Sequence, residues 1–182
     1  MFDLLLVDLR SKDLHEKISK KLQVEYLSES LHTELKEVNG IIFGPNLRII
    51  VSLPVRIKQK TKNVHFVIDT GSPKTYICEE VYESFKVILP NSSTYQILLN
   101  NKRTVVHLPP IDSNFTDINV LGTEYLKATG SNLTINFTNE NERVSIYFDN
   151  DKNEITSRLG QSISQVEPNV LGRIFGIVLL VL

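Results

Sequence analysis

Residues 64–77 read VHFVIDTGSPKTYI, and this stretch decides the fold. The apolar run at 64–68 predicts a buried strand. That strand delivers one acid, Asp69, into a Thr-Gly-Ser turn, where Gly71 allows the backbone to reverse sharply. A carboxylate at the end of a buried strand needs hydrogen bonds, which the neighbouring hydroxyl and amide groups can donate. The pattern therefore indicates an acid that is held in a fixed place for use.

A surface turn is the alternative interpretation of Asp-Thr-Gly, because Asp and Gly are common turn residues and the tripeptide also arises by chance. The apolar residues on both sides of the motif argue against a surface turn.

The length and composition of the 182-residue chain exclude several classes of protein. Its length suits one domain with extensions, and its 41% apolar residues suffice for a core. The net charge is −1, with 20 basic and 21 acidic residues interspersed, so no nucleic-acid partner is expected.

The one cysteine, Cys78, excludes an intrachain disulfide and a multi-cysteine metal site, and its place after a strand-like run predicts a buried thiol. The four histidines lack metal-ligand spacing and are interpreted as structural, so neither a metal nor a cofactor is predicted.

The first 45 residues are predicted to form an N-terminal helical extension. Residues 1–10 make a poor signal peptide, because Asp3 precedes a short apolar run, and this favours a cytoplasmic location. Leucine and other apolar residues recur at three- and four-residue steps over 11–38, which predicts a helical region. Its apolar stripe either packs on the following domain or binds a partner.

From residue 46 the apolar period changes to two, which is typical of strands. A strand at 49–57 and a polar turn at 59–63 form a hairpin with the strand that delivers Asp69. Further along the chain, the pattern predicts a short helix, a hairpin with an Asn-Asn turn, an apolar pair followed by glycine and a helix, and a last hairpin. These elements fall at 79–86, 95–108, 118–126 and 133–148.

The C-terminal part is predicted to comprise a polar linker at 149–169 and an apolar tail at 170–182. The tail is interrupted by Arg173 and is shorter than the roughly 20 residues needed to span a bilayer. It is interpreted as a strand, an interface segment or a truncated anchor, and membrane association is expected through this tail alone.

Over residues 47–148 the order of these predicted elements resembles that of the retropepsins and their cellular relatives. Retropepsins are the single-lobe aspartic proteases of retroviruses and retrotransposons. The resemblance rests on a two-part signature in the predicted domain at 46–148. Its parts are Asp69-Thr70-Gly71-Ser72 after apolar residues, and Val120-Leu121-Gly122 about fifty residues later.

The resemblance implies a mainly β fold: a single-lobe, closed β-barrel in which the Asp69 loop packs against Val120, Leu121 and Gly122. Because the chain holds one Asp-Thr-Gly, activity would require a homodimer with one Asp69 from each chain. By the same resemblance, Thr70 hydrogen-bonds across the two-fold axis, Gly71 permits close backbone approach and Ser72 supports the outer carboxylate oxygen.

The implied activity is that of an aspartic endopeptidase of mobile-element origin, acting on a peptide or protein substrate without a metal or cofactor. The two carboxylates would share one proton and activate a water molecule.

The chain departs from the family at the flap, a hairpin that covers the active site and is usually rich in glycine at its tip. No glycine occurs between Gly71 and Gly122, so the flap would be 88–95 or the turn at Asn100–Asn101, and either is short. A trimmed flap leaves open a catalytically weak or inactive protein-interaction module. A membrane-associated structural protein, suggested by the tail alone, is a third reading.

Overall fold

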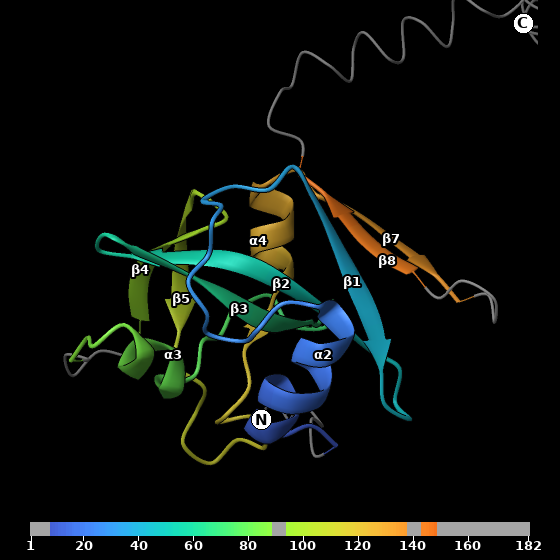
Figure 1. The fold of residues 1–182 in the computed structure, drawn as a ribbon, viewed down its shortest axis with the longest axis horizontal. Coiled ribbons are helices and arrows are strands. Elements are labelled where there is room, and N and C mark those ends of the chain that lie inside the picture. Colours follow the sequence, from blue (N-terminus) through green and yellow to red (C-terminus); the bar gives the residue numbers. More distant parts are fainter. Residues whose placement is uncertain (1–7, 89–93, 138–142, 149–182) are drawn as a thin grey trace, which may run out of the picture. The chain divides into compact units, whose positions relative to one another are not determined.

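The computed structural model describes residues 8–88, 94–137 and 143–148 (Figure 1). Strands dominate this part of the chain, which confirms the prediction of a mainly β fold. The strands are β1 (Glu37–Phe43), β2 (Arg48–Ile57), β3 (Lys60–Ile68), β4 (Thr94–Leu99), β5 (Lys102–His107), β6 (Val120–Leu121), β7 (Asn132–Asn136) and β8 (Arg143–Tyr147). The helical segments are α1 (Ser11–Asp13), a π-helical turn (Leu14–Ile18) and α2 (Ser19–Leu22), which are continuous, then α3 (Glu79–Ser84) and α4 (Thr123–Ala128).

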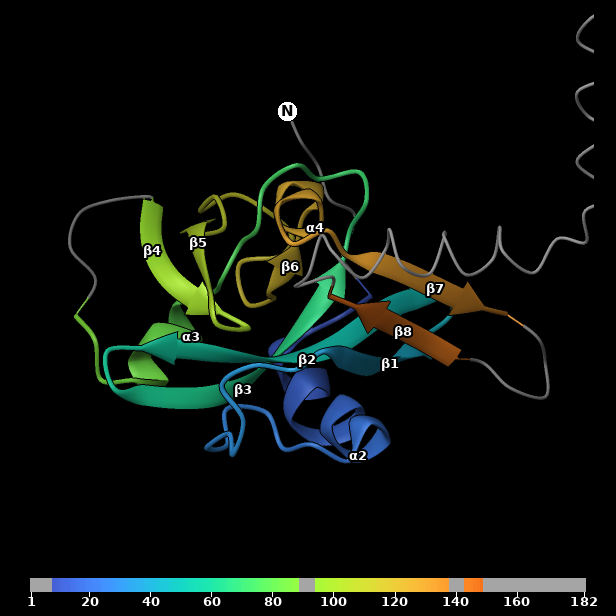
Figure 2. The same cartoon turned by 90° about the horizontal axis from the view of Figure 1, so that it is seen from above.

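The strands form one sheet in the order β5-β4-β2-β1-β8-β7, and β3 pairs with both β2 and β6. Isolated bridges join Tyr76 to His107 of β5 and to Val120 of β6. With these bridges a ring runs through β5, β4, β2, β3 and β6, in rough agreement with the barrel expected from the sequence, although the sheet itself is not closed. Strands β1, β8 and β7 continue outward from β2 as an open sheet (Figure 2).

The predicted hairpin that carries Asp69 is formed by β2 and β3, with Ile50 opposite Val67 and Ile57 opposite Lys60. Its turn is shorter than expected, because Lys58 adopts a left-handed conformation (φ 56°) and the chain reverses within two residues. The polar residues 60–63 therefore lie in β3 and not in the turn.

The N-terminal helix is much shorter than predicted. It ends at Leu22, where Gln23 adopts a left-handed conformation (φ 56°). The expected helix as far as Val38 is wrong, because the following segment pairs with the outer edge of β3. Leu27 N–H donates to Asn63 O (2.8 Å), and Asn63 N–H donates to Ser28 O (2.9 Å). Leucine spacing alone could not anticipate the hydrogen bonds that this strand edge offers.

Within the predicted extension, β1 is a member of the sheet and lies between β2 and β8. The compact unit that contains all described residues ends at Asp149. The predicted domain boundary at residue 45 stays a prediction, and the predicted linker (149–169) and apolar tail (170–182) lie outside the described residues. In the described part of the chain, no helix is long and apolar enough to cross a membrane.

The remaining predicted elements are confirmed. The helix at 79–86 is α3, and the hairpin with the Asn-Asn turn is β4–β5, whose turn residues Asn100 and Asn101 are both left-handed (φ 46° and 61°). The apolar pair, glycine and helix are β6, Gly122 and α4, and the last hairpin is β7–β8. Cys78 is 1% exposed, as predicted for a structural thiol, and burial raises its pKa to about 11.

Candidate active site

Strand β3 carries Asp69 to a point where its backbone is fixed by β6. Val67 and Ile68 pair in parallel with Val120 and Leu121. Immediately after this ladder, Asp69 N–H donates to Leu121 O at 3.1 Å. The main chain of the acid is thus held by strand pairing, and its side chain starts from a defined position.

The chain returns to β6 after the turn, on the opposite side of that strand. Tyr76 N–H donates to Val120 O (2.8 Å), and Val120 N–H donates to Tyr76 O (2.9 Å). Strand β6 therefore lies between β3 and the segment around Tyr76, and it holds both ends of the loop at 69–75. The two parts of the sequence signature are in contact in the structure.

Gly122 is the position where the loop approaches β6 most closely. A Cβ atom at this residue would lie 2.2 Å from Lys74 O and 2.6 Å from Pro73 O, closer than side-chain carbons come to other atoms. Its N–H donates to Thr75 Oγ1 (3.2 Å). Only glycine fits here without moving the backbone of the loop, which is the reason for a glycine after the apolar pair.

The first turn of α4 binds the same loop. Thr123 N–H donates to Ser72 O (2.8 Å), and Glu124 N–H donates to Pro73 O (3.0 Å). These donors have no partner within the helix itself, because the first N–H groups of a helix lack one. The loop carbonyls satisfy them, so α4 and the loop form one hydrogen-bonded unit.

The two carboxylate oxygens of Asp69 have different surroundings. Oδ1 accepts the N–H of Gly71 at 2.8 Å. Oδ2 is buried and has no hydrogen-bond partner among the described residues. A buried polar atom without a hydrogen-bond partner destabilises the folded state by about 1–3 kcal/mol, so we expect a further hydrogen-bond donor next to this oxygen. The loop therefore orients the carboxylate with one oxygen and leaves the other for a second group.

The residues that flank Asp69 differ in their contacts with its carboxylate. Gly71 has its main chain next to the carboxylate. Ser72 is buried, but its hydroxyl donates to Lys74 O (3.0 Å) and not to the carboxylate of Asp69. Ser72 thus supports the shape of the loop in this chain. Thr70 is exposed, and its implied contact across a two-fold axis stays a prediction.

Sequence reasoning missed Asn119, which is fully buried next to the loop. Its Oδ1 accepts Cys78 N–H (3.0 Å), and its Nδ2 donates to Tyr26 OH (2.8 Å) and to His65 O (3.1 Å). One amide thus joins the N-terminal segment, β3 and the segment after the loop. The available signal was an asparagine within an apolar run, because such a residue must be hydrogen-bonded when buried.

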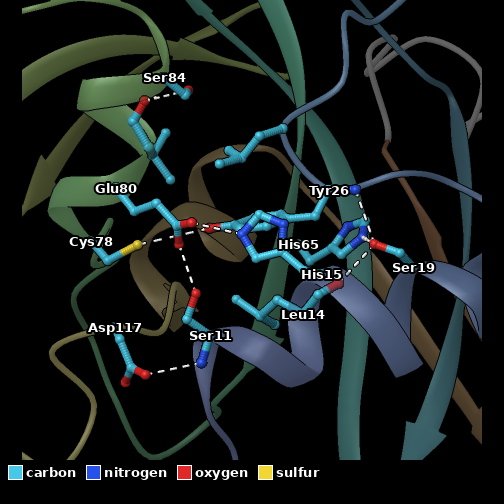
Figure 3. Close-up of polar contacts among 12 residues, drawn as sticks. Ser11, Leu14, His15, Ser19, Tyr26, His65, Cys78, Glu80, Ser84 and Asp117 are labelled. Carbon is cyan, nitrogen blue, oxygen red and sulfur yellow. Dashed lines mark hydrogen bonds and ion pairs between the residues drawn. The ribbon is translucent and has the colours of Figure 1, made fainter.

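The N-terminal segment packs against this region through a chain of polar contacts (Figure 3). Ser19 Oγ donates to Leu14 O (2.7 Å), so it accepts from His65 Nε2 (3.1 Å) and from Tyr26 N–H (2.9 Å). His65 therefore carries a proton on Nε2, and burial lowers its pKa to about 4. Burial likewise raises the pKa of Tyr26.

A second group of contacts holds the helix to α3 and to the chain before β6. Glu80 accepts hydrogen bonds from Ser11 Oγ (2.8 Å) and pairs with His15 Nε2 (2.6 Å), and Asp117 Oδ2 accepts Ser11 N–H (2.9 Å) (Figure 3). The N-terminal segment is therefore built into the domain that carries Asp69.

The β4–β5 hairpin does not place its Asn-Asn tip over Asp69. Asn100 is buried, exchanges two hydrogen bonds with the backbone of Leu35 (2.7 and 2.9 Å), and donates its own N–H to Pro54 O (2.8 Å). Pro54 lies opposite Asn63, six residues before Asp69 in β3. At about 3.3 Å per residue, this is roughly 20 Å along the strand. The Asn-Asn turn is therefore excluded as a flap.

The other candidate for the flap, residues 88–95, falls mainly outside the described residues. Thr94 at its end is paired with His107, which bridges to Tyr76 beside the Asp69 loop. This end of the hairpin is thus the one nearer to the candidate site. Within the described ranges, no cluster of three or more His, Cys, Asp or Glu side chains has the geometry to hold a metal ion.

The chain was compared with protein families, curated proteins and solved structures. No protein-family model and no curated protein matches the chain. Among solved structures, the chain is similar to a retropepsin-like aspartic protease from Rickettsia conorii, with a TM-score of 0.44 and 13% sequence identity. The match covers 62% of this chain and 90% of that chain.

Proposed function

We propose that the chain is one subunit of a homodimeric aspartic endopeptidase in which Asp69 is the catalytic acid. The observation that carries the proposal is the carboxylate of Asp69, which is oriented by Gly71 N–H on one oxygen and has a buried, unpartnered oxygen on the other side. A second carboxylate with a shared proton is a group that satisfies such an oxygen, because one of the pair then donates a hydrogen bond to the other.

The proposed chemistry follows from this pairing. Two carboxylates a few ångströms apart do not both ionise, so the pair holds one proton and titrates as a unit. The ionised carboxylate removes a proton from a bound water molecule, and the protonated carboxylate donates a hydrogen bond to the carbonyl oxygen of the peptide bond to be cleaved. Water then attacks the carbonyl carbon, and the departing amine takes up the proton.

The decisive experiment compares the wild type with Asp69→Asn. Peptide-library cleavage is measured between pH 4 and 7, and molar mass is measured by light scattering on the same samples. We expect cleavage by a dimeric wild type and no cleavage by D69N, whose amide cannot act as the base. Asp112→Asn is the matched control, because Asp112 is an exposed acid in the loop before β6. Equal cleavage by D69N and the wild type would contradict the proposal.

A non-catalytic interaction module is the second candidate, and the anchored Asn-Asn turn favours it. With that turn excluded as a flap, only the short stretch at 88–95 is left to cover the substrate. A stable dimer that cleaves no peptide at any pH in this range supports the interaction module over the protease.

A further inference from the structure

We propose that the outer edge of β5 binds an extended, acidic segment of a partner protein by adding it to the sheet as a further strand. This inference goes beyond the proposed endopeptidase and does not depend on Asp69. Strand β5 ends the described sheet on its side, and β4 pairs along its whole length (Figure 1). The edge of β5 that faces away from β4 is therefore where a further strand would add.

The backbone of His107 shows which groups of β5 point to that edge. His107 N–H donates to Thr75 O (3.0 Å), and His107 O accepts Ile77 N–H (2.9 Å). Because successive residues of a strand direct their N–H and C=O groups to opposite edges, Val105 and Arg103 present theirs on the same side as His107. No strand among the described residues pairs with Val105 or Arg103 there. The edge thus forms hydrogen bonds at one end and offers the backbone groups of two more residues.

The charges of the neighbouring strands indicate the kind of segment that would bind. Strands β2, β3, β4 and β5 contain lysine and arginine but no aspartate or glutamate. Lys102 and Arg103 are exposed at the beginning of β5. Leu98 of β4 lies opposite Arg103 on one side and opposite Arg56 of β2 on the other, so the two arginines share one face of the sheet. Carboxylates on an added strand would be attracted by these cations.

The same cations make a second copy of β5 a poor occupant of the edge. Lysine and arginine on an edge strand oppose its pairing with a strand of like charge. Glu34 accepts a hydrogen bond from Asn101 Nδ2 (2.9 Å) at the turn before β5, so Lys102 and Arg103 leave the edge with a net positive charge. Val105 is 51% exposed, and an added strand would cover part of its side chain. The edge therefore fits an acidic strand and disfavours a basic one.

Fluorescence anisotropy of a labelled peptide tests the charge preference. The probe is a synthetic peptide of alternating glutamate and valine, and the control peptide has lysine in place of glutamate. Both are titrated with the full chain carrying Asp69→Asn, so that cleavage cannot alter the probe. We expect the acidic peptide to bind and the basic peptide not to bind. Lys102→Glu combined with Arg103→Glu should weaken binding about tenfold. Lys20→Glu combined with Lys127→Glu, at exposed positions of α2 and α4, should leave it unchanged.

Substitutions at Val105 separate strand addition from a general attraction between charges. Val105→Pro removes an N–H group that points away from β4, so the pairing of β5 with β4 loses no hydrogen bond. Val105→Thr is the matched control, because it keeps the N–H group and suits a strand. We expect V105P to bind the acidic peptide about fivefold more weakly than V105T. The acidic peptide with every amide N-methylated makes the same test on a chain unchanged at residue 105, because it keeps its carboxylates and loses its donors.

The outcomes distinguish strand addition from the other occupants. Weaker binding after charge reversal, after V105P and after N-methylation supports the proposal. No binding of the acidic peptide, an affinity unchanged by charge reversal, or equal affinities for the N-methylated and unmodified peptides would overturn it. A single-stranded oligonucleotide that binds Lys102 and Arg103 while the acidic peptide does not would overturn it in favour of a nucleic acid. Because the binding protein carries Asp69→Asn, each result is independent of whether the wild type cleaves peptides.

Discussion

Gly122→Ala is the substitution whose effect can be worked out most fully from the structure. The new methyl group would lie 2.2 Å from Lys74 O and 2.5 Å from Lys74 C. Both are backbone atoms, so relief requires the loop to move by about 1 Å, because unstrained carbon contacts are near 3.5 Å. That movement pulls Ser72 O and Pro73 O away from the N–H groups of α4.

The expected cost has two parts. Overpacking a well-filled site costs about 1–3 kcal/mol, and two weakened hydrogen bonds add about 1 kcal/mol each. The free energy of unfolding should therefore fall by about 3–5 kcal/mol. In a domain of this size, 1 kcal/mol lowers Tm by roughly 2–4 °C, so a decrease of about 10 °C is expected.

The assay is thermal unfolding followed by circular dichroism, with cleavage measured well below the lower Tm. Gly71→Ala is the control, because its methyl group would meet only Asp69 Oδ1 at 3.2 Å, on an exposed part of the loop. We expect G71A to keep a Tm near that of the wild type and to lose cleavage, since it displaces the carboxylate. A Tm for G122A within about 1 °C of the wild type would refute the reasoning, because the loop would then not pack as described.

Two further predictions concern the buried polar groups beside the loop. Asn119→Ala removes three buried hydrogen bonds, so we expect a loss of about 3–6 kcal/mol in urea denaturation. Asn119→Asp should not restore the stability, because it loses both donors and buries a charge. His65 has a folded-state pKa of about 4, below its ordinary value of 6.5, so the unfolded chain binds a proton first as the pH falls. Its contribution to stability is complete above pH 6.5 and is lost between about pH 6.5 and 4, in total about 3 kcal/mol. The slope of stability against pH between 6.5 and 5 should become flatter in His65→Gln, and an unchanged slope would contradict the assignment.

This pH dependence bears on the proposed protease. A carboxylate pair with one shared proton favours mildly acidic conditions, whereas His65 destabilises the fold as the solution becomes acidic. Cleavage should therefore decline at low pH for a structural reason as well as a chemical one. Comparing the pH profile of cleavage with that of unfolding separates the two effects.

The N-terminal segment is part of the domain that carries Asp69, and it does not form a separate helical extension over its predicted length. Residues 11–38 were expected to form a helical region beside the domain, but residues 27–30 pair with β3, the strand that leads to Asp69. Tyr26 and Ser19 reach the buried residues Asn119 and His65. Any shorter version of the protein that lacks this segment would expose the edge of β3 and leave buried polar groups without partners.

The sequence alone determined the elements whose signal is local. The alternation from Arg48 to Ile57, the Asn100–Asn101 turn and the apolar pair before Gly122 each predicted a correct element, because side-chain period and turn chemistry depend on neighbours in the chain. The contact between the Asp69 loop and Gly122 was also anticipated, through the resemblance to a family in which those two motifs meet.

Tertiary structure decided whatever depends on partners distant in sequence. Residues 27–30 have helical leucine spacing, yet they pair with β3, since an unpaired strand edge offers backbone hydrogen bonds that a short exposed helix cannot match. The Asn-Asn tip was fixed against Leu35, 65 residues away in the chain, because a buried polar group binds a suitable partner in the folded chain. The tertiary structure also decided the surroundings of Asp69 Oδ2, since its burial and its lack of a donor arise only when β3, β6 and α4 come together.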